Sequence, residues 1–311
     1  MIIEIPCSLL LSSFQVHGAN KISKILLHLF CIDSDTNVIV VSNISAEESD
    51  ELNKRDTLHA VHYVNYAMLD DYLTDQHIVP DIGVSFDIKC DTLAMFRNIN
   101  NYFFPVVGLI HSLGLRQDFE DLQRVSKVFS PYDMLICPSE NTQQTAINLG
   151  LDSTHTDVAH YGLDHKKYVP INNKNKLRKQ LNLPLNTPIV LILSRISPAV
   201  KMDLTPVFRR LPTILKSFPD VVFYIVGDVL DSQYVEQLKQ FCVHLGVEKH
   251  VVWEHHPTHD AIEQYYQASD IFLSLTDCSE TYGLTVMEAM SCGLPVVISE
   301  FAGYKSHITD G

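Results

Sequence analysis

The sequence has no apolar run long enough to span a bilayer, no C-x-x-C pair and little positive charge in its first half. No stretch approaches the roughly 20 apolar residues that a membrane-spanning helix requires. The seven cysteines are odd in number and widely spaced, a pattern that indicates reduced thiols and not a disulfide framework. We therefore expect a cytoplasmic protein without a transmembrane segment.

The apolar start of the chain, residues 2–11, resembles the hydrophobic part of a signal peptide. Glu4 interrupts this segment, and no Lys or Arg precedes Lys21, whereas a signal peptide begins with positive charge. We expect no signal peptide, although cleavage of this segment stays an alternative.

The acidic residues are concentrated in the first half of the chain. Residues 1–164 hold 9 Lys and Arg against 22 Asp and Glu, a net charge of −13, and residues 165–311 hold 14 against 15, a net charge of −1. This asymmetry disfavours nucleic acid and anionic lipid as partners. A neutral or small ligand fits the first half better.

Short apolar runs alternate with helix-like segments along both halves of the chain. Of the 311 residues, 46% are hydrophobic and 19% charged, which suffices for two globular domains and argues against disorder. The alternation is typical of βαβ units around a parallel sheet. A polar connector separates the two series, so we predict domains at 1–165 and 166–311. The runs are residues 38–41, 82–86, 105–110, 134–137, 189–193, 223–226 and 271–275.

The loop and helix after the run 271–275 carry the strongest functional signal. The apolar positions within residues 284–290 fit a helix. The first amides of such a helix, those of Leu284 and Thr285, have no intrahelical acceptor and can hold a phosphate. Gly283 would let the phosphate approach the backbone closely.

Charged residues surround this predicted phosphate site. Glu288 lies one turn into the helix, where its carboxylate can accept hydrogen bonds from ribose hydroxyls. Glu280 in the loop can reach a sugar on the far side of a diphosphate. Arg195 and Lys201 follow the run 189–193 and supply cations suited to phosphate oxygens. Such cations can stabilise a departing diphosphate in place of a metal.

The stretch 280–288 resembles the E-x7-E motif of retaining glycosyltransferases of family 4, the glycosyltransferase group 1 family, which have the GT-B fold. Residues 194–201 resemble the G-R-L…K diphosphate site of that family. Residues 289–297 resemble its E-A-M-x-x-G-x-P-V-V run, and residues 302–304 resemble its glycine loop. The resemblance implies an α/β protein of two Rossmann-like domains, the second of which holds the donor.

The first half resembles the family less closely. Residues 110–114 are similar to the H-S-L-G segment of the sucrose-phosphate synthase branch, which implies that His111 faces the transferred sugar. Residues 161–164 resemble the G-hydrophobic-D turn that leads into the second domain. The family's Gly-rich loop after the first strand is thin here, and only residues 17–20, with Gly18, could serve.

The resemblance implies retaining transfer of a hexose from a UDP-, GDP- or ADP-sugar to an acceptor hydroxyl, with no cofactor and no metal. Glu280 and His111 would be the catalytic residues. The acceptor, a glycan or a small molecule but not a nucleic acid, would be held by the acidic first domain. The implied substrate-binding residues are Arg195, Lys201, Gly283, Leu284, Thr285, Glu288 and Gly18.

Members of this family continue past the position of Gly311 through further elements. We therefore expect the second domain to lack its C-terminal end, and a partner chain or an oligomer to cover the face left open. Two alternatives to an active transferase stay open. One is a catalytically inactive fragment or nucleotide-sugar-binding module, and the other is a sugar-nucleotide epimerase of similar fold.

Each candidate residue also has an ordinary structural interpretation. Glu280 fits a loop charge, Glu288 a solvated helix face and His111 a packed core residue, while the two cations fit surface charges after a strand. Gly18 fits the start of a helix over residues 21–30. Because α/β folds bind ligands where parallel strands end, the functional interpretation is favoured.

Overall fold

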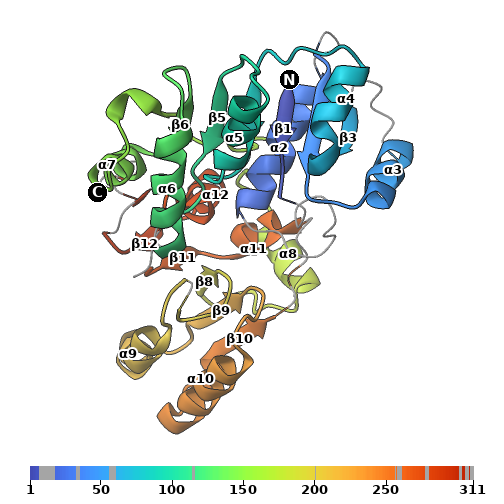
Figure 1. The fold of residues 1–311 in the computed structure, drawn as a ribbon. Helices are drawn as coiled ribbons and strands as arrows, with labels where there is room; N and C mark the ends of the chain where they lie inside the picture. Colours follow the sequence, from blue (N-terminus) through green and yellow to red (C-terminus); the bar gives the residue numbers. More distant parts are fainter. Residues whose placement is uncertain are drawn as a thin grey trace. The chain divides into compact units, whose positions relative to one another are not determined.

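The computed structural model describes residues 1–6, 18–32, 36–55, 61–113, 116–199, 201–255, 257, 261–276, 280–300, 303–304 and 308. The chain divides into two compact units, Met1–Tyr161 and Gly162–Gly311, whereas the sequence predicts a boundary after residue 165. Each unit is an α/β structure built on its own parallel sheet (Figure 1).

The first unit contains a seven-stranded parallel sheet in the order β3-β2-β1-β4-β5-β6-β7. Its strands are β1 (Ile2–Glu4), β2 (Val38–Ser42), β3 (Val61–Asn65), β4 (Gly83–Ser85), β5 (Val106–Leu109), β6 (Met134–Cys137) and β7 (Thr156–Val158). Its α-helices are α2 (Gly18–Ile32), α3 (Ala46–Arg55), α4 (Leu69–Asp75), α5 (Asp91–Ile99), α6 (Arg116–Val128) and α7 (Glu140–Asn148), with 3-10 turns η1 (Tyr66–Met68) and η2 (Ser153–His155).

Strand β1 lies at the point where this sheet changes direction. It pairs in parallel with β2 on one side and with β4 on the other, so that Ile2 is opposite both Ile39 and Gly83. Strands β2 and β3 therefore lie on one side of β1, and β4 to β7 lie on the other. In open α/β sheets, such a switch point is where ligands bind, at the carboxyl ends of the strands.

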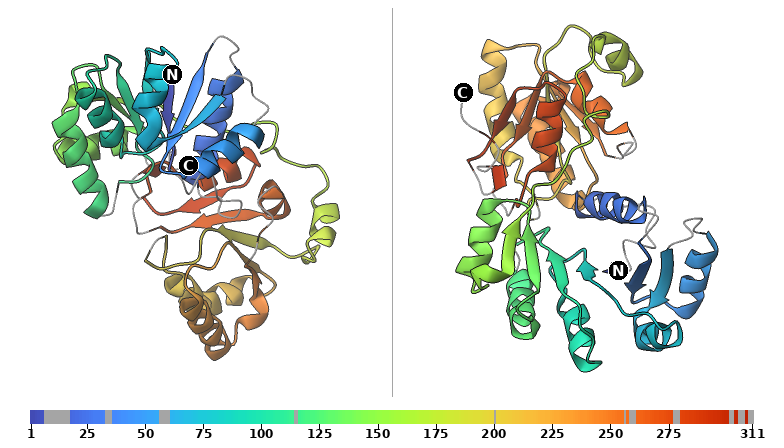
Figure 2. Two further views of the ribbon diagram at one scale, coloured as in Figure 1. Left: turned by 45° about the vertical axis from the view of Figure 1, so that its right-hand side comes forward. Right: turned by 90° about the horizontal axis from the view of Figure 1, so that it is seen from above.

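Helices cover both sides of the first sheet, as the right-hand view of Figure 2 shows. Leu69 of α4, Leu93 of α5 and Leu122 of α6 pack in one core with Ile2. Ile3 belongs to a separate core on the opposite face, against α2 and α3. Neighbouring residues of a strand thus serve different cores, and each fully buried Leu or Ile contributes roughly 1.5–3 kcal/mol.

The second unit contains a five-stranded parallel sheet in the order β10-β9-β8-β11-β12. Its strands are β8 (Ile189–Leu193), β9 (Val222–Val226), β10 (Val251–Glu254), β11 (Ile271–Ser274) and β12 (Val296–Ile298). Its helices are α8 (Lys174–Gln180), α9 (Thr205–Ser217), α10 (Ser232–Leu245), α11 (Glu263–Ala268) and α12 (Leu284–Ser291), with the 3-10 turn η3 (Glu248–His250).

The switch point of the second sheet lies between β8 and β11. Helices α8, α11 and α12 pack against one face, and α9 and α10 pack against the other, as Figure 1 shows. Local signals fix the helix ends: Asp231 caps α10 by accepting from the Tyr234 amide, and Gly246 ends that helix at φ 68°, a conformation that favours glycine.

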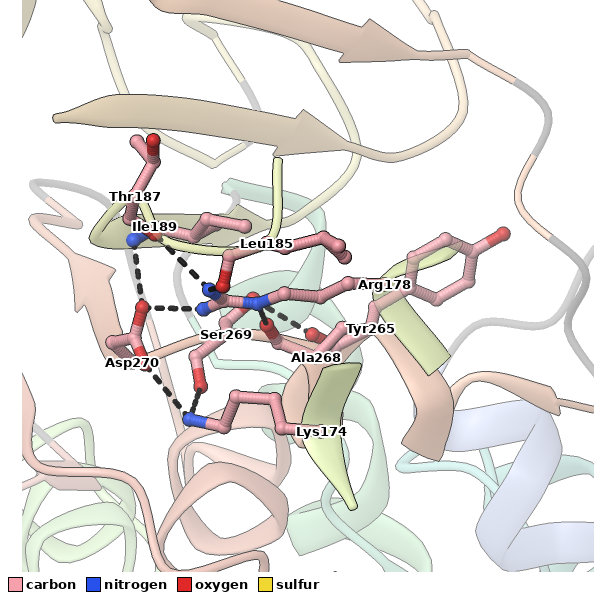
Figure 3. A network of polar contacts seen from close by, with 9 residues as sticks. All are labelled: Lys174, Arg178, Leu185, Thr187, Ile189, Tyr265, Ala268, Ser269 and Asp270. Atoms are coloured by element: carbon pink, nitrogen blue, oxygen red, sulfur yellow. Dashed lines mark hydrogen bonds and ion pairs between the residues drawn. The ribbon is translucent and has the colours of Figure 1, made fainter. Parts of the chain in front are cut away.

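A buried arginine fixes the amino-terminal edge of the second sheet (Figure 3). Arg178 of α8 is 4% exposed and donates to the Asp270 carboxylate at 2.5 Å and to the Ala268 carbonyl at 2.8 Å. It also donates to the carbonyls of Leu185 and Thr187, both at 3.1 Å. The guanidinium thus holds α8 against the segments that precede β8 and β11.

Asp270 completes this cluster from the other side. Its carboxylate accepts the Ile189 amide, the first of β8, at 2.8 Å and the Lys174 ammonium at 2.8 Å. Opposite charges and hydrogen bonds outweigh its partial burial, so the pKa of Asp270 lies below its usual range. The carboxylate therefore stays ionised and ties two neighbouring strands to α8.

The first unit repeats this arrangement with Arg97 and Asp133. Arg97 of α5 donates to Asp133 at 2.5 and 2.8 Å and to the Phe104 carbonyl at 3.1 Å. Asp133 accepts the amide of Val106, the first residue of β5, at 2.7 Å. Each sheet is therefore fixed at its amino-terminal edge by an Arg–Asp pair whose guanidinium is buried.

Replacing Arg178 by Met would leave Asp270 without its guanidinium and three backbone carbonyls without their donor. We expect the free energy of unfolding to fall by about 2–4 kcal/mol, since breaking a buried ion pair is strongly destabilising. Denaturant unfolding of the full chain measures this. The matched control is Lys176→Met on the exposed side of α8, and equal stability of the two variants would contradict the role assigned to Arg178.

Candidate functional site

The start of α12 is held in an unusual backbone conformation. Gly283 precedes the helix at φ 90°, which side chains other than glycine rarely adopt. A Cβ on Gly283 would also lie 2.5 Å from the Tyr304 ring. The sequence predicts Gly283 for close approach of a phosphate. The structure adds two other requirements for glycine, the backbone conformation and the packing of Tyr304.

Glu280 is fixed beside this helix start. Its carboxylate accepts the Gly283 amide at 3.1 Å and the Lys201 ammonium at 3.2 Å. Its backbone carbonyl accepts the Gly303 amide at 2.9 Å. A Cβ on Gly303 would collide with the Thr281 backbone, so the two segments pack closely. The preceding residues 277–279 lie outside the described part of the chain.

The amides of Leu284 and Thr285 follow directly after Gly283 as the first of α12. Being at the helix start, they have no intrahelical acceptor and lie at the positive end of the helix dipole. Lys201 is a short distance away, since it contacts the same Glu280 carboxylate that accepts the Gly283 amide. The structure thus brings Glu280, Lys201 and the helix start together, an arrangement that can receive an anion.

Arg195 lies in a loop that two strand ends hold in place. The Ile196 amide donates to the Asp228 carbonyl at 2.8 Å, and the Leu230 amide donates back to the Ile196 carbonyl at 3.2 Å. A Cβ on Gly227 would lie 1.8 Å from the Ser194 carbonyl oxygen. The glycine after β9 therefore allows the two loops to pass in contact, which positions Arg195 just after β8.

Glu288 has a different environment from the one that the sequence suggests. It is 5% exposed and accepts the Tyr266 hydroxyl at 2.8 Å. It also interacts with the Tyr168 hydroxyl, and burial together with the Glu288 charge raises the pKa of that tyrosine. The interpretation of Glu288 as part of a solvated helix face is therefore wrong. Its contact with ribose stays a prediction. A carboxylate has about four acceptor sites, so two tyrosines do not saturate it.

His111 lies in the first unit, just after β5. Its Nδ1 is 2.6 Å from the Tyr161 hydroxyl, and the two rings stack with centroids 5.8 Å apart. Burial lowers the pKa of His111 to about 4, although a hydrogen bond to the Phe86 backbone opposes this shift. The imidazole is therefore neutral at physiological pH and could lie near a developing positive charge without repelling it.

Acidic groups gather near the carboxyl ends of β1 and β4. Burial raises the pKa of Glu4 to about 8, and the charges of Asp91 and Asp87 add to the effect. Burial also raises the pKa of Asp87. Their sequence positions gave no sign of this cluster, because the residues come from separate segments.

Gly18 is the first residue of α2, so this helix begins before Lys21, where the sequence predicts its start. A role for Gly18 in ligand binding stays a prediction, and residue 17 lies outside the described residues. Within the described ranges, no group of three or more His, Cys, Asp or Glu is placed to hold a metal ion. No described helix has the length and apolar character needed to cross a membrane.

Comparison with known proteins supports the interpretation of the second unit. Residues 173–311 match the family model described as "Glycosyl transferases group 1". A D-inositol 3-phosphate glycosyltransferase of Mycolicibacterium vanbaalenii is 28% identical over 197 residues, covering 60% of this chain and 42% of that protein. Its namesake in Streptomyces bingchenggensis is 27% identical over 181 residues, covering 55% of this chain and 39% of that protein. The match thus spans less than half the length of either relative.

Solved structures extend the likeness to the whole chain. Anabaena HepE, determined with UDP and glucose, has a TM-score of 0.74 at 22% identity, covering 100% of this chain and 84% of that one. Sucrose-phosphate synthase from Thermosynechococcus elongatus has a TM-score of 0.67 at 16% identity, covering 98% and 82%.

Two Rossmann-like units, each with a parallel sheet and a switch point, together with these neighbours define the GT-B fold of glycosyltransferases. Within this class, residues 173–311, which make up less than half of the chain, match the model of the group 1 glycosyl transferases. The fold that the E-x7-E resemblance implies is confirmed, and the family match over the second unit agrees with that resemblance.

The Tyr161 hydroxyl is expected to determine the environment of His111 Nδ1. Tyr161→Phe removes the hydroxyl and keeps the stacked ring. In a 15N NMR titration, we expect His111 to stay neutral above about pH 5 in both proteins, while the Nδ1 resonance shifts in the variant. Tyr132→Phe, on an exposed tyrosine of the same unit, is the control. An unchanged Nδ1 resonance in Tyr161→Phe would rule out the contact.

Glu4 makes stability depend on pH with a definite sign. Because its pKa in the folded chain is raised from 4.5 to about 8, the stability linked to its protonated form is fully present below pH 4.5. That stability is lost as pH rises through about 8. The quantity to compare is the unfolding temperature of Glu4→Gln minus that of the native chain. We expect this difference to be a few degrees larger at pH 8 than at pH 5. Glu47→Gln controls for loss of one exposed carboxylate, and a pH-independent difference would contradict the assignment.

Proposed function

We propose that this protein is a retaining glycosyltransferase that moves a hexose from a nucleoside-diphosphate sugar to an acceptor hydroxyl. The second unit would hold the donor and the acidic first unit the acceptor. The observation that carries the proposal is the start of α12, where Glu280 contacts both the Gly283 amide and Lys201. At this place the Glu280 carboxylate contacts both the start of a helix and the cation of Lys201.

Each part of this arrangement has a function in binding the donor. The Leu284 and Thr285 amides and Lys201 would hold the diphosphate, and Arg195 would add a planar pair of donors. When the diphosphate binds, Lys201 shares its three donors between phosphate and Glu280. The Glu280 carboxylate then has acceptor capacity for sugar hydroxyls, which fixes the hexose relative to the phosphates.

In the reaction, the bond from the anomeric carbon to the diphosphate oxygen breaks and a bond to the acceptor oxygen forms. Retention requires that the acceptor attack from the face that the diphosphate leaves. A phosphate oxygen of the leaving group would take the acceptor proton, so the chain need not supply a general base. Arg195, Lys201 and the helix amides would stabilise the negative charge as it develops, which a divalent cation would otherwise do.

One further residue of each unit would contact the substrates, His111 in the first and Glu288 in the second. His111 is neutral and would contact the transferred sugar by hydrogen bonding, without adding positive charge beside a developing oxocarbenium ion. Glu288 would bind ribose while Tyr266 and Tyr168 hold its carboxylate in place. The two tyrosines fix the carboxylate, so it is in position before the nucleotide arrives.

A structure of similar fold guides the choice of donor. HepE was solved with UDP and glucose, so UDP-glucose is the first donor to test. A second candidate function is nucleotide-sugar binding without turnover, because the Glu280 carboxylate that would orient the sugar is paired with Lys201. Measured turnover decides between the two.

Isothermal calorimetry against UDP, GDP, ADP and their hexose derivatives tests the proposal. We expect one nucleotide to bind, and Arg195→Ala to weaken its Kd about 10- to 100-fold, the value of one or two charge-assisted hydrogen bonds. Arg210→Ala, an exposed arginine of α9, removes the same charge elsewhere and should leave Kd unchanged.

Turnover then separates the two candidate functions. Sugar transfer or donor hydrolysis that is lost in Glu280→Ala would establish the transferase. Tight binding without either reaction would favour the binding module, and a folded chain that binds none of the nucleotides would overturn both.

A further inference from the structure

The switch point of the first sheet, between the carboxyl ends of β1 and β4, contains polar groups that the proposed chemistry does not yet use. Glu4 ends β1 and is opposite Ser85, which ends β4. Neighbouring residues of parallel strands direct their side chains to the same face, and the Ser85 side chain hydrogen-bonds the Glu4 carboxyl group. This is the position at which open α/β sheets bind ligands.

Two polar atoms here are buried with no partner among the described residues. One is Oε2 of Glu4, and the other is the hydroxyl oxygen of Tyr66, just after β3. The groups are near each other, since burial and then the Glu4 charge raise the pKa of Tyr66. A buried polar atom without a hydrogen bond costs roughly 1–3 kcal/mol, and a ligand hydroxyl or a water would remove that cost.

The charges around these atoms do not cancel. Arg124 pairs with Asp91 at 3.0 Å and also contacts Asp121. Lys89 lies 3.9 Å from Asp121 and is largely exposed. Asp87, in the loop after β4, accepts the Lys89 backbone amide at 3.4 Å, and the Lys89 charge only partly opposes the rise in the pKa of Asp87 that burial causes. Three aspartates therefore outnumber two cations, even with Glu4 protonated.

His111, which is proposed to contact the transferred sugar, lies beside this edge of the sheet. Its imidazole contacts the backbone of Phe86, which lies in sequence between Ser85 and Asp87. A ligand against Asp87 would therefore be next to the side chain proposed to contact the transferred sugar. In the proposed reaction, the acceptor hydroxyl has to lie next to the transferred sugar, and so near the His111 side chain.

We propose that this edge, formed by Glu4, Ser85, Tyr66 and Asp87, is the acceptor subsite, and that it takes an uncharged polyhydroxy compound while rejecting a phosphorylated one. The proposal rests on the proposed function. Asp87 accepts hydrogen bonds from acceptor hydroxyls, as carboxylates do from vicinal diols, and Glu4 with Tyr66 receives a further hydroxyl. A phosphate dianion here faces uncompensated carboxylates and no unpaired cation of the cluster. The preference would separate this chain from relatives named for inositol 3-phosphate.

Paired acceptors test the proposal. NMR titration of the 15N-labelled full chain, with UDP present, would compare glucose with glucose 6-phosphate and myo-inositol with inositol 3-phosphate. We expect the neutral member of at least one pair to bind about tenfold or more tightly, with shifts at Asp87 and Tyr66. If turnover is found, kcat/KM should show the same preference. Equal or tighter binding of the phosphates, or no shift at these residues, would overturn the proposal.

Asp87→Asn is the decisive variant, because it keeps the size of the side chain and removes its charge. We expect its discrimination against the phosphorylated member to fall about tenfold, with UDP affinity unchanged. Asp75→Asn, at the exposed end of α4, changes the net charge equally and should preserve the discrimination. Unaltered discrimination in Asp87→Asn would refute the subsite. Since UDP affinity is measured separately, loss of donor binding identifies failure of the proposed function instead.

Discussion

The buried guanidinium of Arg178 is the contact on which the second unit most depends. It joins α8 to the two strands that flank the switch point, through one carboxylate and three backbone carbonyls. A buried charge is tolerated only where its donors are satisfied, so one arrangement of these chain segments is selected. Arg97 with Asp133 does the same in the first unit. Both pairs lie where strands begin, and the groups with functional chemistry lie where strands end.

The central strands other than β1 can be predicted from the sequence, and the edge strands cannot. The apolar runs at 134–137 and 189–193 coincide with β6 and β8, because a central parallel strand is buried on both faces. The prediction does not contain β3, β7, β10 or β12, each of which lies at the edge of its sheet. It also lacks the central strand β1, which has only three residues. Edge strands expose one side and carry polar residues, so their pattern is weak. Pairing with a neighbour distant in sequence decides their structure.

The candidate site shows the same division. Glu280, Lys201 and the start of α12 are predictable, because the motif gives their positions and the strand ends bring them together. The partners of Glu288 and His111 are not. Tyr266 is 22 residues from Glu288, and Tyr161 is 50 residues from His111, so no local pattern links them. The buried environment of Glu4 depends likewise on strands joined only by folding.

The packing of Tyr304 on Gly283 has a consequence for how this sequence can diverge. The ring occupies the place where a Cβ at position 283 would lie, and its hydroxyl is 2.8 Å from that of Ser274. A larger residue at 283 would need both a change of the backbone conformation, which has φ 90° there, and the loss of the ring at position 304. The two positions are therefore expected to co-vary among homologous chains, with Ser274 losing its hydroxyl more readily once the tyrosine is gone. Homologous chains are therefore expected to keep or to lose Gly283, Tyr304 and Ser274 together.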